Sequence, residues 1–148
     1  MRLSNKIAIV TGAGGGIGRA TALRFASEGA KVFAADINED GIRETADLSD
    51  AIEPLVVDVS SGSSVSEMVQ TVVDGHGRLD IIFSNAGIMR DGNVIDLSEN
   101  EWDAMFAVNT RAMLVTTQVA ATAMIAPLAI AHVDVVHGRD RQGAVPAC

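Results

Sequence analysis

The sequence predicts an α/β fold in which helices cover a parallel sheet. Short apolar runs rich in β-branched residues alternate with segments of helical periodicity along most of the 148 residues. A glycine-rich stretch, residues 11–18 (TGAGGGIG), joins the first apolar run to the first helical segment. Hydrophobic residues make up 48% of the chain and charged residues 20%, which is typical of a globular domain with a core. These observations indicate right-handed strand–helix–strand units.

The first elements are read directly from the apolar pattern. Residues 6–11 (KIAIVT) predict a strand that is buried on both faces. Residues 18–30 place apolar side chains at helical spacing, and Gly29 is a suitable residue to end that helix. A second strand is expected at residues 31–36 (KVFAAD) and a second helix at residues 39–49.

Two capping-box patterns predict helix starts further along the chain. Ser64 is followed three residues later by Glu67, and Ser98 is followed by Glu101 at the same spacing. The expected elements are strands at residues 53–60 and 79–87, a helix over residues 68–73, and a long helix from about Glu99 to Met124.

Charge and cysteine content exclude several classes of function. The formal net charge is -8, and such an acidic surface disfavours nucleic acid as a partner. The single cysteine, Cys148, is the last residue, so the sequence offers no disulfide framework and no thiol metal site. We expect no bound metal.

One segment, residues 112–131, approaches the length of a membrane span. It contains three threonines, a glutamine and a proline, so we interpret it as a buried helix instead. The apolar run near the N-terminus is too short for a signal peptide and leads directly into the glycine-rich stretch. We therefore expect a cytoplasmic protein that has no membrane partner.

The glycine-rich stretch lies where the first strand ends and the first helix begins. At this edge of a parallel sheet, dinucleotides bind with their pyrophosphate at the N-terminus of the helix. Gly12 allows a tight turn, Gly16 lets the backbone approach a phosphate, and Gly18 permits close packing of helix on strand. The spacing Gly-x-x-x-Gly-x-Gly differs from the common Gly-x-Gly-x-x-Gly, and a plain strand–helix turn is the alternative interpretation.

Asp36 ends the second predicted strand, 18 residues after Gly18. An acidic residue at this place accepts hydrogen bonds from the ribose hydroxyls of adenosine, and its charge repels the 2′-phosphate of NADP. A solvated residue at a strand end is the alternative. Together with the glycine-rich stretch, Asp36 predicts a dinucleotide site that prefers NAD to NADP.

Four motifs, in order along the chain, resemble those of the short-chain dehydrogenase/reductase family. TGAGGGIG resembles the family's glycine loop, and DVS at residues 58–60 resembles the segment after its third strand. NAG at residues 85–87 resembles its Asn-Ala-Gly motif, and VNT at residues 108–110 resembles the helix that carries its catalytic asparagine. The resemblance extends from residue 1 to about residue 125.

The resemblance implies an NAD-binding domain over residues 1–126. Its fold would be the N-terminal half of a Rossmann-type doubly wound sheet, incomplete, with strand order 3-2-1-4. Asp58 would bond the adenine amino group, and Val59 would line the adenine pocket. The implied cofactor-binding residues are Thr11, Gly12, Gly16, Ile17, Gly18, Asp36, Ile37, Asp58, Val59, Asn85, Ala86 and Gly87.

The resemblance implies an oxidoreductase that transfers a hydride between NAD and a small alcohol or ketone. Of the family's four catalytic residues, only the asparagine is present, as Asn109. The family's serine and its Tyr-x-x-x-Lys pair have no counterpart, because the chain contains no tyrosine, its last lysine is Lys31 and its last serine is Ser98. We expect a catalytically incomplete chain. A non-catalytic dinucleotide-binding module and an inactive fragment are the alternatives.

Residues 127–148 form a tail that differs in character from the rest of the chain. Helical periodicity is lost after about Ile125, although residues 132–136 (HVDVV) suggest a poor fifth strand. His132 and His137 titrate near neutrality but have no residue to orient them. Read one nucleotide later, residues 135–141 can encode a serine segment like that of the family, so we hypothesise an out-of-frame tail. The family resemblance also suggests self-association through the helix at residues 99–124.

Overall fold

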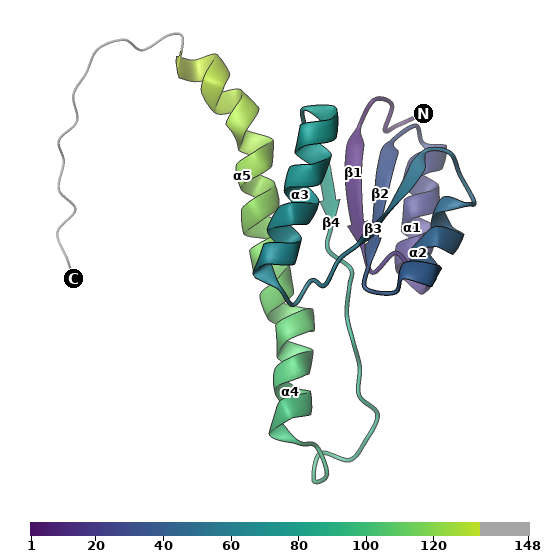
Figure 1. The fold of residues 1–148 in the computed structure, drawn as a ribbon, viewed down its shortest axis with the longest axis vertical. Coiled ribbons are helices and arrows are strands. Elements are labelled where there is room, and N and C mark those ends of the chain that lie inside the picture. Colours follow the sequence, from purple (N-terminus) through teal and green to yellow (C-terminus); the bar gives the residue numbers. More distant parts are fainter. Residues whose placement is uncertain (134–148) are drawn as a thin grey trace, which may run out of the picture.

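The computed structural model describes the backbone of residues 1–133 and the side chains of residues 1–125. Within this range the chain forms a parallel four-stranded sheet of order β3-β2-β1-β4 (Figure 1). The predicted α/β class and strand order are confirmed. The strands are β1 (Ile7–Thr11), β2 (Lys31–Asp36), β3 (Ile52–Val56) and β4 (Ile81–Phe83).

Helices cover both faces of the sheet (Figure 1). The helices α1 (Gly16–Ser27) and α2 (Glu39–Ala46) pack on one face, where Val10 and Val32 are fully buried. The helices α3 (Gly62–His76) and α5 (Ala112–Val133) cover the other face, where Ile9 and Phe33 point into a second cluster of apolar residues. This alternation explains why the predicted strands are apolar at consecutive positions.

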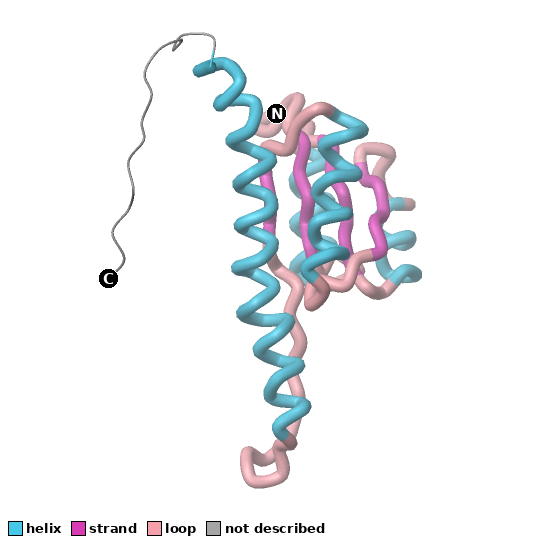
Figure 2. The backbone as a smooth tube through the Cα atoms, turned by 60° about the vertical axis from the view of Figure 1, so that its left-hand side comes forward, coloured by secondary structure: helices cyan, strands magenta, loops and turns pink. Residues whose placement is uncertain are grey.

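The predicted long helix is one rod built from three segments (Figure 2). It comprises α4 (Glu99–Phe106), the π-helical turn η1 (Ala107–Arg111) and α5, which continues to Val133. The predicted end at Met124 is therefore too early. α4 extends beyond the edge of the sheet together with the loop of residues 84–98 (Figure 1). No helix in the described range has both the length and the apolarity that a membrane span requires.

Three further predictions need correction. Ser64 does not cap α3, because Ser61 is the N-cap and accepts a hydrogen bond from the Ser64 N–H. The strand predicted at residues 79–87 is β4, only Ile81–Phe83. Of the predicted fifth strand at residues 132–136, the first two residues belong to α5 and the remainder lies outside the described residues. The capping box of Ser98 and Glu101 is confirmed at the start of α4.

Candidate functional site: the edge of the sheet at the strand carboxyl ends

The loop between β1 and α1 packs against the segment after β4 with no space for side chains. Gly12 has a φ of +67°, and a Cβ added there would lie 2.8 Å from Ala86 Cα. A Cβ on Gly18 would lie 2.0 Å from the carbonyl oxygen of Gly12. Both positions therefore require glycine, and the roles of a tight turn and of close helix packing match the geometry.

The start of α1 is open to solvent. A Cβ at Gly15 or Gly16 would meet nothing within 4 Å, and Gly16 has a φ of +50°. Gly15 is the N-cap and provides no side-chain hydrogen bond, and the first turn of α1 contains no acidic residue. The side chain of Ile17 is exposed. N–H groups of this first turn are thus available to an anion, which the helix dipole favours.

The Asp36 carboxylate is fixed by two backbone donors. The N–H of Gly14 donates to Asp36 Oδ2 at 3.0 Å, and the N–H of Asn38 donates to Asp36 Oδ1 at 3.0 Å. Each carboxylate oxygen has two lone-pair positions, so one position on each oxygen remains after these bonds. The half-buried carboxylate can therefore accept two more hydrogen bonds.

A cavity of about 170 Å³ opens beside this carboxylate. Asp36 and the exposed Asp58 supply charged groups to its wall, and the remaining lining is mainly apolar. The Asp58 carboxylate is oriented by the N–H and hydroxyl of Ser60, which donate to Oδ1 at 2.9 and 2.7 Å. The cavity is lined by Gly12, Asp36, Ile37, Val57, Asp58, Val59, Ala86, Gly87, Ile88 and Val108.

Thr11 and Asn85 tie the end of β1 to the segment after β4. The buried Thr11 hydroxyl oxygen accepts hydrogen bonds from the N–H groups of Asn85 and Ala86 at 3.0 and 3.1 Å. Asn85 Nδ2 donates in return to the carbonyl oxygen of Thr11 at 3.1 Å. Thr11 and Asn85 hold the edge of the sheet in place and do not line the cavity.

Asn109 lies in the middle of η1 and is hydrogen-bonded to both backbone polar groups of Ile88. Its Oδ1 accepts from the N–H of Ile88 at 2.8 Å, and its Nδ2 donates to the carbonyl oxygen of Ile88 at 2.8 Å. A Cβ on Gly87 would lie 3.3 Å from Asn109 Oδ1. Asn109 therefore braces the cavity wall, to which Gly87, Ile88 and Val108 belong.

Comparison with known proteins identifies the family. The sequence model of the short chain dehydrogenase family matches residues 6–143. This chain belongs to the short chain dehydrogenase family. The match begins just before β1 and includes every strand and helix described above.

Among curated relatives of this chain is the 3-oxoacyl-[acyl-carrier-protein] reductase FabG of Thermotoga maritima. It is 39% identical over 129 residues, which cover 84% of this chain and 52% of the relative. The (2S)-[(R)-hydroxy(phenyl)methyl]succinyl-CoA dehydrogenase subunit BbsD of Thauera aromatica is 38% identical, with 80% and 49% covered. The chain thus spans about half the length of the curated relatives it matches.

Solved structures of similar proteins share the fold. A short chain dehydrogenase/reductase from Burkholderia phymatum in complex with NAD has a TM-score of 0.81 and 31% identity, over 86% of this chain and 47% of that chain. The 3-ketoacyl-(acyl-carrier-protein) reductase of Brucella melitensis, complexed with NADH, has a TM-score of 0.80 and 30% identity, with 87% and 54% covered.

The structure of this family member brings together most of the residues predicted from its sequence. Seven of them line the cavity. Of the other five, Thr11 ends β1, Asn85 follows β4, and Gly16, Ile17 and Gly18 form the first turn of α1. Three lining residues were missed by the sequence prediction. These residues are Val57, Ile88 and Val108. Each is adjacent in sequence to a predicted residue, and this adjacency is the signal that could have found them.

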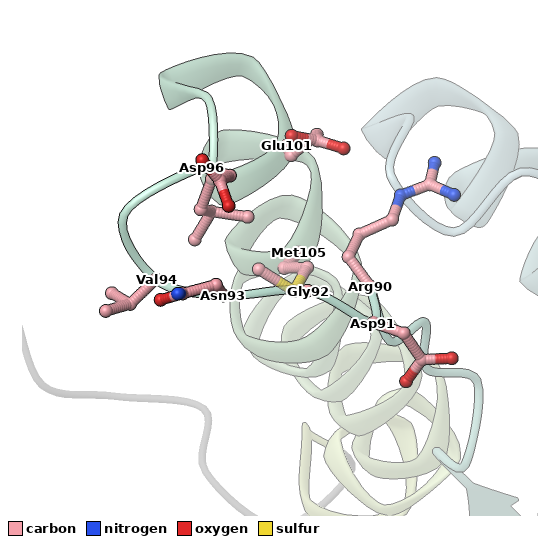
Figure 3. Close-up of a pocket in the computed structure, with 9 residues that line it drawn as sticks. Arg90, Asp91, Gly92, Asn93, Val94, Asp96, Glu101 and Met105 are labelled. Carbon is pink, nitrogen blue, oxygen red and sulfur yellow. The ribbon is translucent and has the colours of Figure 1, made fainter.

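A second hollow, of about 250 Å³, lies between the loop after β4 and α4 (Figure 3). Its polar groups include Arg90 and Glu101. Hydrogen bonds from the Ser98 hydroxyl and backbone N–H lower the pKa of the Glu101 carboxyl, which forms the capping box of α4. This carboxylate is therefore committed to capping the start of α4, and we assign no chemistry to the hollow.

Proposed function

We propose that this chain is the cofactor-binding part of an NAD-dependent oxidoreductase. The observation that supports it best is the Asp36 carboxylate, which is held beside the cavity with one lone-pair position left on each oxygen. Two vicinal ribose hydroxyls fit two such acceptors. A 2′-phosphate would bring negative charge against a carboxylate that already has its orientation fixed, so NAD is preferred to NADP.

The remaining residues fit the other parts of the cofactor. The open start of α1, at Gly16, Ile17 and Gly18, would hold the pyrophosphate. Val59 and Ile37 would pack against the adenine, and Asp58 would accept from its amino group. Two of the similar solved structures are complexes with NAD and with NADH, which supports this choice of cofactor.

NAD, when bound, supplies a hydride acceptor. The residues of this chain bind and orient the cofactor, and Asn109 keeps the wall formed by Ile88 and Val108 in position. The whole protein would act on an alcohol or a ketone, and the names of the reductase and dehydrogenase relatives support this reaction class. We place the activity in the cytoplasm, where NAD is available.

A non-catalytic dinucleotide-binding module is the second candidate. It is favoured by one observation: the 148 residues contain no tyrosine and no lysine beyond Lys31, so no group of the Tyr-x-x-x-Lys type is present to move the alcohol proton. Under this proposal the chain binds NAD without turnover.

Cofactor choice is tested by calorimetric titration of the 148-residue chain with NAD and with NADP. We expect the dissociation constant for NAD to be lower by about tenfold or more, and the Asp36→Ala variant to narrow this gap. Asp50→Ala is the matched control, because Asp50 is an exposed aspartate outside the cavity lining. This variant should keep the wild-type difference between the dissociation constants for NAD and NADP. Equal affinities in the folded wild-type chain would remove Asp36 from this role.

A further inference from the structure

The guanidinium of Arg19 joins α1, from which it projects, to the glycine loop and to α2. It projects from α1, and its Nε donates to the hydroxyl of Thr45 on α2 at 2.9 Å. Its Nη2 donates to the carbonyl oxygens of Gly14 at 2.7 Å and Gly41 at 3.1 Å, and to Glu44 Oε2 at 2.9 Å. The two protons of Nη2 thus serve three acceptors, so at least one bond is shared.

Thr45 completes this cluster from the buried side of α2. Its side chain is fully buried, and its hydroxyl accepts from Arg19 while the carbonyl oxygen of Ala13 lies 2.8 Å away as an acceptor. The hydroxyl has one proton, and the carbonyl oxygen of Gly41 lies 2.9 Å away as a second acceptor. The buried Thr45 hydroxyl therefore accepts from Arg19 and donates to the backbone, so its hydrogen-bonding capacity is used.

α2 lies directly on the glycine loop at this point. A Cβ added to Gly41 would lie 2.6 Å from the carbonyl oxygen of Gly14, so the two backbones touch. Gly14 is consequently held from both sides: Arg19 bonds its carbonyl oxygen, and its N–H donates to Asp36 Oδ2. Gly14 thus connects the Arg19 cluster to the Asp36 carboxylate, which lines the cavity.

We propose that Arg19 and Thr45 are positioning residues for NAD recognition. They fix Gly14, and Gly14 fixes the orientation in which Asp36 presents its remaining lone pairs. This inference rests on the proposed NAD site and deepens it. Although Arg19 is a positive charge next to the loop, it would not favour a 2′-phosphate. Its donors are bonded to acceptors within the chain, and it forms an ion pair with Glu44.

The arginine geometry suits this task. A guanidinium is a planar fork with several donors, and lysine offers one compact ammonium at the end of a flexible chain. Arg19→Lys therefore cannot reach Thr45 and the two carbonyl oxygens at once. Thr45→Val keeps the shape of the buried side chain and removes its hydroxyl.

The experiment is a double-mutant cycle read by NAD titration of the full 148-residue chain. We expect Arg19→Lys and Thr45→Val each to raise the NAD dissociation constant about tenfold, the size of effect that loss of one well-oriented hydrogen bond to a charged group produces. In a chain that already carries Asp36→Ala, the same substitutions should change the NAD dissociation constant by less than about twofold. A merely structural role would lower affinity equally in both backgrounds, and that result, or no loss in either, would overturn the inference.

Two matched controls use the same substitutions elsewhere. Arg43→Lys changes an arginine of α2 that pairs with Glu39 on the same helix, and Thr71→Val changes an exposed threonine of α3 that donates to its own helix. Both should leave NAD affinity unchanged. Circular dichroism establishes that each variant is folded, and Arg19→Lys carries the test if Thr45→Val does not fold.

A second measurement needs no cofactor. Hydrogen exchange at the Gly14 amide should accelerate in Arg19→Lys and Thr45→Val relative to both controls, because Gly14 loses its support. Unchanged exchange would overturn the inference by itself. Failure of the wild-type chain to bind NAD would instead contradict the proposed function, so the two failures are distinguished.

Discussion

The side-chain amide of Asn109 and the backbone N–H and C=O of Ile88 form a reciprocal pair of hydrogen bonds, each 2.8 Å long. Asn109 is the residue that we predicted to match the family's catalytic asparagine. Both of its side-chain groups are occupied by the backbone of Ile88. Its side chain therefore determines where the segment after β4 lies against η1, and it acts on the site through that segment.

Removal of this brace should loosen the cavity. Asn109→Ala loses both bonds at an exposed position, and we expect the free energy of unfolding to fall by about 1–2 kcal/mol. NAD affinity should fall as well, because Ile88 and Val108 line the cavity. Denaturant titration and calorimetry measure the two effects.

Asn93→Ala is the control for this prediction. Asn93 lies in the loop of residues 84–98, which also contains Ile88, and its Oδ1 accepts from the N–H of Ile95 at 3.1 Å. It lines the second hollow rather than the NAD cavity, so its loss should leave NAD affinity unchanged. Equal loss of NAD affinity in both variants would show that Asn109 has no special role in the brace.

A carboxylate joins the starts of β1 and β4 at the opposite end of the sheet. Asp80 Oδ2 accepts from the N–H of Ile7 at 2.9 Å and from Arg78 Nε at 3.0 Å, and Lys6 lies 3.5 Å from Oδ1. Burial raises the pKa of Asp80, but the hydrogen bonds from Arg78 and Ile7 and the two positive charges outweigh it, so the pKa is lowered.

The lowered pKa predicts acid sensitivity. Because the folded-state pKa of Asp80 is below the unfolded value of about 3.9, the carboxylate contributes stability that is present above that value and is lost as the pH falls through the folded pKa. Asp80→Asn should cost about 2 kcal/mol at neutral pH and flatten the loss of stability below about pH 4.

Urea titrations across this pH range measure the effect. Asp74→Asn is the control, because Asp74 is exposed on α3 and accepts from Gln70 Nε2 one turn earlier. A profile for Asp80→Asn that runs parallel to the wild type at every pH would contradict the assignment.

Much of the fold could be predicted because the strands β1 and β2 are buried on both faces and their apolar residues are consecutive. The start of α3 at Ser61 could not be predicted, because several serines between residues 60 and 66 have a hydroxyl that could cap a helix. Ser64 uses its hydroxyl to accept from the Asp58 N–H at 3.2 Å instead. β4 ends early because the N–H groups of Asn85 and Ala86 donate to the Thr11 hydroxyl and not to the backbone of a neighbouring strand.

The site was predictable where a residue's chemistry is visible in sequence, as for Gly12, Gly18 and Asp36. Arg19 and Thr45 carry no such signal, since a helical arginine and a helical threonine usually face solvent. Their contacts arise only when α2 packs on the glycine loop. The π-helical turn around Asn109 also leaves no mark in the apolar periodicity.

Self-association through the rod of α4, η1 and α5 is the next prediction. In the described part of the chain, Trp102, Phe106 and Met113 are about half exposed, and the rings of Trp102 and Phe106 stack 4.6 Å apart. Exposed apolar surface of this kind marks an interface, and we expect a second copy of the chain to cover it.

The double substitution Trp102→Glu and Phe106→Glu should shift the molecular mass towards that of the monomer. Size-exclusion chromatography with light scattering over a range of concentrations measures this shift. Asp103→Asn, on the same helix, should leave the mass unchanged. A mass that is the same in all three proteins would show that the rod makes no such contact.

The last prediction concerns the tail of residues 127–148. The motifs of the family are intact through Asn109, whereas the serine, tyrosine and lysine are missing together. Gradual divergence would erode motifs along the whole chain, and a single insertion or deletion removes all later ones at once. His137, which belongs to this tail, lies outside the described residues, and α5 runs on past the point where periodicity is lost.

Sequencing of the gene should reveal, in another frame that begins between about codons 120 and 130, a serine segment followed by Tyr-x-x-x-Lys. The present 148-residue chain should produce no NADH from alcohols, because it has no tyrosine to take the proton, and the corrected chain should produce it. Turnover by the present chain that His137→Ala abolishes would instead identify a replacement acid. If neither other frame encodes the pair, residues 127–143 are native sequence, in agreement with the family match that extends to residue 143. The chain would then act as an NAD-binding module without turnover.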